Sequence, residues 1–298
     1  MSPIFRKPDP VDAPNRVLAF FPASHANART LNGEQIAQYN ALGYVSPIAV
    51  YEPPQAERIR TYISDLLASV LGAGDRRNAY SINSYHHVCA GLWDIVTEPR
   101  IVDLVADILG PNFVAWGSHL FAKLPNDGKE VPFHQDAVYW PLTPSRTVTV
   151  WLAIDDADAG NAAMEFVPAS HLGGPMEHEG LPLDGTRVLG RRARGVTSAT
   201  PRFVNALRAG QASLHSDLLL HGSSANRSER RRAGLTLRYA AADVRLIDGY
   251  DVWRKNAVHL RGGDPDGFWY NRRRPVGEAP ERMAQFWDEF DGQPLSAE

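Results

Sequence analysis

The two sides of Gly110-Pro111 follow different hydrophobic periods. Before this break, apolar residues recur with the 3.6-residue period of amphipathic helices. After it they come in short runs separated by Gly, Pro, Asn and Asp, which is typical of strands. Helices followed by a series of short strands predict an α+β chain built around one β core, a sandwich or a barrel. The length of 298 residues fits either one such unit with added elements or two domains.

Three helices are expected before the break. The first begins with the capping box Asn32-Gly-Glu-Gln35, whose two end side chains can satisfy exposed backbone donors, and it stops at Gly43. The second runs from about Pro54 to Leu71 and carries one apolar stripe. The third lies between Thr97, as its N-cap, and Leu109. These helices are expected to support the β core.

Six apolar runs after the break are expected to be strands. They cover Phe113–Trp116, His119–Leu124, Thr147–Ile154, Met164–Val167, Ala212–Leu220 and Leu235–Ala240. The stretch 173–210 has few apolar pairs and is expected to run away from the sheet. We expect residues 1–30 to form an arm without chemistry, residues 31–298 to form a single domain, and Met283–Phe290 to form a short amphipathic piece.

Composition limits the ways in which this chain can bind a metal. The formal net charge is −3, so a strongly basic nucleic-acid-binding surface is not expected. Cys89 is the single cysteine, which excludes an internal disulfide and a thiolate metal site; we expect it to be a small buried residue. No apolar run is long enough to cross a membrane and no signal peptide is recognisable, so a cytoplasmic location is expected. Any metal must rely on His and carboxylate ligands.

Two His-x-Asp triplets offer such ligands, His134-Gln135-Asp136 and His215-Ser216-Asp217. Alternate residues of a strand point to the same face, so each triplet can present an imidazole and a carboxylate to one ion. For the second triplet the nearby further ligand is His221, and extended chain would place it about 20 Å from His215, too far to share an ion. We therefore interpret His215 and Asp217 as structural residues, although they could face a substrate cavity.

The first triplet has a third candidate ligand in His221, which follows the apolar run Leu218–Leu220 at a strand end. Two His and one carboxylate from separate strands form the facial triad that is typical of non-haem Fe(II). Arg232 begins the next strand, and a guanidinium there is suited to bidentate capture of a carboxylate such as the free end of 2-oxoglutarate. His134, Asp136 and His221 are thus the candidate metal ligands.

Taken together, these motifs resemble the phytanoyl-CoA dioxygenase family. The resemblance spans roughly residues 32–270 and rests on joint spacing rather than on any single motif. The residues that carry it are His134-Gln-Asp136, Trp151 in Val-Thr-Val-Trp-Leu-Ala, the segment Asn161–His171, and His221-Gly-Ser223 with Arg232. It implies a double-stranded β-helix, a cupin-like jelly roll with N-terminal supporting helices. It also implies iron ligation by His134, Asp136 and His221, with 2-oxoglutarate as cosubstrate and O2 as oxidant.

The resemblance also concerns the reaction. Members of the family hydroxylate an unactivated C–H bond and release succinate and CO2, whereas its halogenases have a small residue at the position that Asp136 occupies here. Hydroxylation of a small organic metabolite is therefore expected. Ser223 and Trp151 match positions that line the cosubstrate pocket beside Arg232. Desaturation, cyclisation or epimerisation at the same iron site, and a non-redox cupin-like metal-binding protein, stay open as alternatives.

Candidates for the substrate wall come from the segments around the first triplet. They are the polar and aromatic residues Tyr139, Trp140, Lys123, His119 and Asn83. An aromatic residue beside a β core belongs to the core about as often as it lines a pocket, so both interpretations stay open for Tyr139 and Trp140. The basic run Arg230–Arg232 lacks an aromatic platform for bases. We expect a small-molecule substrate and neither a nucleic-acid nor a membrane partner.

Overall fold

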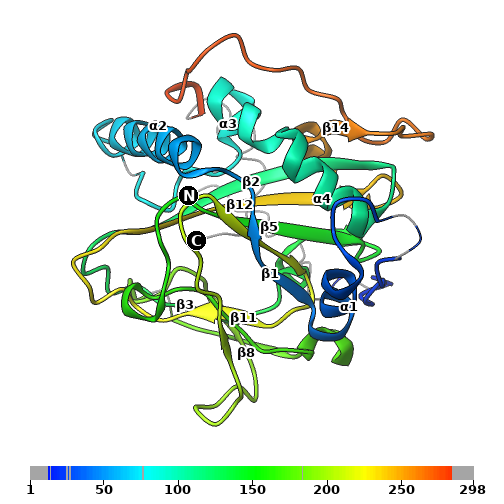
Figure 1. Cartoon of the computed structure of the whole chain (residues 1–298), viewed down its shortest axis with the longest axis horizontal. Coiled ribbons are helices and arrows are strands. Elements are labelled where there is room, and N and C mark those ends of the chain that lie inside the picture. The colour runs from blue at the N-terminus through cyan, green and yellow to red at the C-terminus, as the bar shows by residue number, and fades with distance from the viewer. Residues whose placement is uncertain are drawn as a thin grey trace, which may run out of the picture.

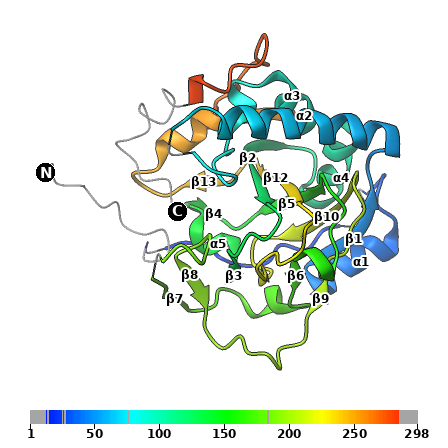
Figure 2. The same cartoon turned by 90° about the vertical axis from the view of Figure 1, so that its left-hand side faces the viewer.

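Two larger antiparallel sheets lie one above the other, and the main helices cover the outer face of the larger sheet (Figure 1 and Figure 2). This computed structural model describes residues 13, 15–24, 26, 28–75, 77–182 and 184–283. The space between the two sheets is where the chemistry-bearing side chains of both sheets meet.

The strands are assigned to the sheets as follows. The six-stranded sheet has the order β1 (Tyr44–Ala49), β10 (Gln211–Ser216), β5 (Thr147–Ala153), β12 (Arg232–Ala241), β2 (Phe113–Lys123) and β14 (Val258–Arg261). The four-stranded sheet has the order β3 (Val131–His134), β11 (His221–Ser223), β6 (Glu165–Phe166) and β9 (Phe203–Val204). Two short pairs complete the set, β4 (Leu142–Thr143) with β13 (Arg245–Leu246) and β7 (His178–Gly180) with β8 (Arg191–Ala193).

The helices lie mainly in the first part of the chain, as the sequence predicts. The α-helices are α1 (Gly33–Leu42), α2 (Pro53–Leu71), α3 (Ala90–Val96), α4 (Pro99–Leu109) and the single turn α5 (Asp136–Tyr139). The 3-10 turns are η3 (Tyr85–His87), η4 (Ala159–Asn161), η5 (Ser170–Gly173) and η6 (Asp251–Asn256). The mixed architecture of helices and antiparallel sheets confirms the α+β class.

The helix ends test the capping predictions. The capping box of Asn32 with Gln35 is present, and Gly43 ends α1 in the left-handed region with φ 85°, so both predictions are confirmed. The N-cap of α4 is Glu98 and not Thr97, so that prediction is wrong. Thr97 instead ends α3, a helix that the sequence analysis missed, and its hydroxyl donates to the carbonyl of Trp93 at 2.9 Å.

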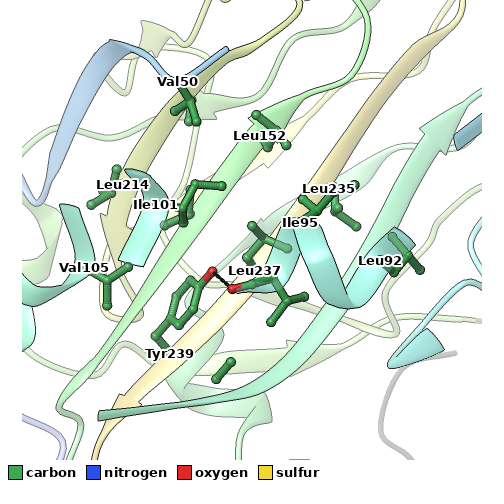
Figure 3. Close-up of a cluster of buried hydrophobic side chains, with 14 of the residues drawn as sticks. Val50, Leu92, Ile95, Ile101, Val105, Leu152, Leu214, Leu235, Leu237 and Tyr239 are labelled. Carbon is green, nitrogen blue, oxygen red and sulfur yellow. Dashed lines mark hydrogen bonds between the residues drawn. The ribbon is translucent and has the colours of Figure 1, made fainter. Parts of the chain in front are cut away.

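Strand β12 shows how one strand serves both the core and the site. Leu235, Leu237 and Tyr239 point to the helix side and are fully buried (Figure 3). Burying each leucine side chain contributes about 2 kcal/mol. The Tyr239 hydroxyl donates to the carbonyl of Val96 at 3.0 Å, which ties the strand to α3. Because side chains alternate, Arg232 and the other even-numbered residues of β12 point to the opposite face, toward the smaller sheet.

Three strand predictions are wrong in their bounds. Phe113–Trp116 and His119–Leu124 belong to one strand, β2, because Gly117 stays within the ladder opposite Arg238. The run Ala212–Leu220 leaves the strand after Ser216, because the chain turns there and crosses to the other sheet. The stretch 173–210 does not run wholly away from the sheets, since β9 pairs with β6.

The described part of the N-terminal arm packs against the domain. Arg16 donates hydrogen bonds to the carbonyl groups of Ala137 (2.7 Å) and Leu142 (3.1 Å), so the arm fastens the segment that follows the His-x-Asp triplet. Of the expected amphipathic piece, Met283 is buried and residues 284–290 lie outside the described residues. Within the described ranges, no helix has the length and apolar character needed to span a membrane.

Candidate metal centre

Three side chains from separate elements converge between the two sheets. His134 is the last residue of β3, Asp136 is the first residue of α5, and His221 begins β11 directly opposite His134. One ligating atom from each of the three lies within 4.8 Å of the others. The expectation that His134 and Asp136 share a strand face is wrong, because a tight helical turn begins at Asp136 and brings its carboxylate back toward the imidazole. The structure thus brings the predicted ligands together by a different local path.

Both imidazole rings are oriented for metal binding through Nε2. Nδ1 of His134 lies 2.9 Å from the carbonyl oxygen of Pro132, and Nδ1 of His221 lies 2.9 Å from that of Leu219. A ring nitrogen that faces a carbonyl must carry the proton, which leaves the lone pair on Nε2. The two Nε2 atoms lie 3.5 Å and 4.0 Å from Oδ1 of Asp136. Two such imidazoles and one carboxylate fit a non-haem Fe(II) ion.

The electrostatics favour the protonation states that a metal ion needs. Burial, together with the charge of His134, lowers the pKa of His221 to about 3, so this imidazole is neutral. Burial alone would raise the pKa of Asp136, but His134, His215 and His221 hold that pKa well below its ordinary value. A neutral imidazole and an ionised carboxylate can ligate a cation without first losing a proton.

His215 lies beside this centre, which corrects the sequence analysis. Its ring centroid is 4.9 Å from that of His221, and its Nε2 is 3.8 Å from Oδ2 of Asp136. The expected separation of about 20 Å assumed extended chain. Instead, a turn closed by the hydrogen bond from Leu219 to the Ser216 carbonyl (3.0 Å) folds the chain back. His215 therefore lines the cavity as a third imidazole.

The predicted cosubstrate residues lie together at one end of the cavity. The guanidinium of Arg232 is buried, donates to the carbonyl of Ala162 (3.1 Å) and to Oγ of Ser223 (3.2 Å), and stands 5.7 Å from the ring of Trp151. Burial lowers the pKa of Arg232 to about 10, so it stays charged at neutral pH. The cavity lining is Phe121, Val131, His134, Asp136, Trp151, Met164, His215, His221, Gly222, Ser223, Arg232, Thr236 and Arg238.

Three of the expected substrate residues are bonded elsewhere and are not part of that lining. The buried amine of Lys123 donates to the carbonyl groups of Lys129 (2.9 Å) and Ser224, so it supports the loop after β11. Nε2 of His119 bonds the carbonyl of Tyr80 at 2.7 Å. Asn83 forms an isolated β-bridge with His119.

The two aromatic candidates lie near the centre but outside the lining. The ring of Tyr139 meets that of His134 edge-on at 5.5 Å, and its hydroxyl donates to the carbonyl of Arg191 (3.0 Å). Trp140 is buried in a second aromatic cluster, 4.9 Å from the ring of Trp116. Both side chains therefore lie next to the site without facing the cavity. They can support α5, which carries Asp136, and the neighbouring part of the cavity lining.

A family model for phytanoyl-CoA dioxygenase matches residues 42–234. The chain belongs to the phytanoyl-CoA dioxygenase family. This confirms the resemblance drawn from the His-x-Asp triplet, His221 and Arg232.

Individual curated proteins are similar to this chain at low identity. The peroxisomal phytanoyl-CoA dioxygenase of Bos taurus is 28% identical over 53% of this chain and 48% of its own length. A probable alpha-ketoglutarate-dependent hypophosphite dioxygenase of Stutzerimonas stutzeri is 25% identical over 71% of this chain and 79% of its own length. The chain spans about half the length of the phytanoyl-CoA dioxygenases it matches.

Among solved structures, the non-heme monooxygenase ThoJ in its apo form is similar throughout. It superposes with a TM-score of 0.73 at 25% identity and covers 86% of this chain and 94% of its own. The superposed share of this phytanoyl-CoA dioxygenase family member is thus larger than the segment that the family model matches.

Asp217, from the second triplet, has an electrostatic role of its own in this family member. Its buried carboxylate accepts a hydrogen bond from Ser145 at 2.6 Å, and its backbone carbonyl accepts from the amide of Ala137 at 3.0 Å. Burial raises its pKa from 3.8 to about 7, a shift that the Ser145 bond only partly offsets and that the charge of Asp136 increases. Asp217 thus lies behind the metal ligands as a partly protonated acid.

Because the pKa of Asp217 is raised, the free energy of unfolding of the wild type should fall as pH rises. Asp217→Asn should remove this pH dependence. Between about pH 4 and pH 7 the folded state holds a proton that the unfolded state has lost, so stability falls as pH rises. In metal-free protein, the free energy of unfolding of the wild type should fall relative to Asp217→Asn by up to about 4 kcal/mol between pH 4 and pH 8. Urea unfolding at several pH values measures this difference. A difference that stays constant with pH would contradict the shift.

Proposed function

We propose that this protein is an Fe(II)/2-oxoglutarate-dependent dioxygenase that hydroxylates a C–H bond of a small organic molecule and releases succinate and CO2. One observation carries the proposal. Two imidazoles locked to present Nε2 and one ionised carboxylate open into the same cavity as a buried guanidinium. A metal-binding site next to a fixed cation suits a cosubstrate that chelates with one end and carries a negative charge at the other.

We further infer that the two facing sheets are the two halves of a double-stranded β-helix. The antiparallel pairing of the described strands and the placement of His134 and His221 on β3 and β11 of the smaller sheet support this inference. In such a fold the metal lies at the open end between the sheets, where β12 of the larger sheet can supply Arg232 from the other side.

Each group of residues has a distinct task in this proposal. His134, Asp136 and His221 would hold Fe(II) on one face and leave its other positions open, and the ion supplies the activation of O2 that is coupled to 2-oxoglutarate cleavage. Arg232 and Ser223 would bind the distal carboxylate and so orient the cosubstrate. The apolar wall, which includes Phe121 and Met164, excludes water and keeps the reacting groups close together.

The substrate class follows from the lining and the charge of the site. Apolar side chains such as Phe121 and Met164 line the cavity together with a few charged groups, which is the usual composition of small-molecule pockets. A formal net charge of −3 gives no support for nucleic acid as a substrate. We therefore propose a free small metabolite as substrate. Hydroxylation is preferred to halogenation because Asp136 occupies the position that a halide would need.

Anaerobic titration tests the proposal directly. Fe(II) and then 2-oxoglutarate are added to metal-free protein, and the visible charge-transfer band of a chelated 2-oxo acid is followed. The band is expected in the wild type and should be lost in His134→Ala. Arg232→Gln should raise the 2-oxoglutarate concentration for half-formation at least about 10-fold, because a charge-assisted bond contributes about 1.5–3 kcal/mol.

The matched control is Arg231→Gln, which removes a guanidinium from the adjacent position. Arg231 pairs with Asp155 at 2.7 Å, outside the cavity lining, so the band should form as in the wild type. Metal binding without any band in the wild type would reject the cosubstrate site and favour the non-redox, cupin-like alternative. Product mass then separates hydroxylation, which adds one oxygen, from desaturation, which removes two hydrogens.

A further inference from the structure

A second arginine faces the same cavity at a distance from Arg232. Arg238 lies six residues further along β12, so alternation places both side chains on the face toward the smaller sheet. Its neighbours in the ladder are Gly117 on β2 and Thr149 on β5. The hydroxyl of Thr149 donates to Oδ2 of Asp136 at 3.3 Å. Arg238 therefore lies at the Asp136 side of the metal site, away from the end at which Arg232 bonds Ser223.

Arg238 has no polar partner within the described part of the chain. No acceptor bonds its guanidinium, no carboxylate forms an ion pair with it, and its Nε is buried without a partner. The neighbouring arginines differ in this respect. Arg231 makes two hydrogen bonds to Asp155, and Arg232 bonds Ala162 and Ser223. A cation withdrawn from water is costly unless an anion faces it. The charge of Asp136 acts on Arg238 from beyond ion-pair distance, and Asp136 is itself a candidate metal ligand, so the unused donors of this guanidinium indicate a missing ligand.

Two tryptophans fix the position of this guanidinium. Its Cζ lies 5.7 Å from the ring of Trp116 and 5.3 Å from the ring of Trp140. Stacking of this kind uses the face of the guanidinium and leaves the N–H groups at its edge free to donate. The indole N–H of Trp116 is likewise buried without a partner. The tryptophans thus hold the cation from outside the cavity lining, and Arg238 itself faces the cavity with unused donors.

We infer that Arg238, held in place by Trp116 and Trp140, forms a carboxylate-binding subsite for the substrate, which makes the substrate an organic acid whose apolar part lies against Phe121 and Met164 of the cavity lining. The planar fork of arginine matches a carboxylate in a bidentate manner. The inference rests on the proposed function, which decides which molecule supplies the carboxylate. The distal carboxylate of 2-oxoglutarate is assigned to Arg232 and its other end to the metal, which leaves the carboxylate of the substrate for Arg238.

The test uses two pairs of probes, phenylacetate with phenylacetamide and decanoate with decanamide. Each is titrated into anaerobic protein that holds Fe(II) and saturating 2-oxoglutarate, and tryptophan fluorescence reports binding. The wild type should bind at least one acid 10-fold or more tightly than its amide. Arg238→Gln should remove this preference, Arg238→Lys should keep part of it, and the control Arg231→Gln should keep all of it.

A second measurement separates the two sources of a carboxylate. The 2-oxoglutarate concentration that half-forms the visible band should change less than 2-fold in Arg238→Gln. A large increase with the acid preference intact would assign Arg238 to the cosubstrate and overturn the inference, as would a wild type without acid preference in either pair. Absence of the band in the wild type would instead reject the proposed function, since fluorescence reads acid binding independently of the band.

Discussion

Asp136→Ala is expected to abolish substrate-coupled turnover of 2-oxoglutarate. Asp136 is the one carboxylate of the candidate metal centre, and its Oδ1 lies within 4.0 Å of Nε2 of both His134 and His221. Without it the site keeps two imidazoles and no negative charge to balance a divalent ion. Removing a residue that merely supports a metal ligand costs about 10–100-fold in affinity or activity, so loss of a ligand should exceed about 100-fold. Succinate release at fixed Fe(II) and 2-oxoglutarate measures the loss.

The control for this prediction is an aspartate in a different setting. Asp158 is half-exposed and paired with Arg230 at 2.7 Å, and a pair that solvent reaches contributes about 0–1 kcal/mol to stability. Asp158→Ala should therefore leave succinate release within about 2-fold of the wild type. Hydroxylation that persists in Asp136→Ala would show that the carboxylate is not a ligand. His215, the further imidazole at the site, would then be the next candidate for the third metal ligand.

The convergence of the three candidate metal ligands could be predicted from the sequence because chemistry limits the candidates so strongly. With one cysteine in the chain, a metal site had to use His and carboxylates, and the triplet at His134 with His221 satisfied this need. The prediction for His215 is wrong because an extended chain overestimates the distance between His215 and His221. A turn between strands of different sheets reverses the chain within four residues, and apolar letters such as Leu218–Leu220 give no sign of it.

The place of Arg238 in the cavity could also be predicted from the sequence, by strand alternation from Arg232. Once Arg232 is placed at the start of a strand, alternation puts Thr236 and Arg238 on the same face, and both line the cavity. The partners of a polar residue, in contrast, cannot be read from alternation. Lys123 donates to the carbonyl of Ser224, which lies 101 residues away in the sequence, so only the three-dimensional structure shows that its amine is turned away from the cavity.

Gly234→Ala is expected to cause a large loss of both stability and 2-oxoglutarate binding. Gly234 lies between Arg232 and Thr236 on the cavity face of β12, and the ring of Trp151 packs against its backbone. A Cβ at this position would lie 2.0 Å from Cζ2 of Trp151, far inside contact distance. Because Trp151 is almost fully buried, the ring cannot move without disturbing its neighbours. Overpacking of a core costs about 1–3 kcal/mol, and we expect about 3 kcal/mol here.

The displaced tryptophan links this stability loss to the cosubstrate. Trp151 stands 5.7 Å from the Arg232 guanidinium, so a shifted ring should also raise the half-saturating 2-oxoglutarate concentration several-fold. Gly117→Ala is the matched control for stability, because its Cβ would meet Cδ of Arg238 at 3.6 Å, an ordinary contact. Urea unfolding compares the two variants. Trp151→Phe in the Gly234→Ala background should restore part of the stability, since the smaller ring vacates the space that the new methyl group needs. Wild-type stability in Gly234→Ala alone would contradict this account of the packing.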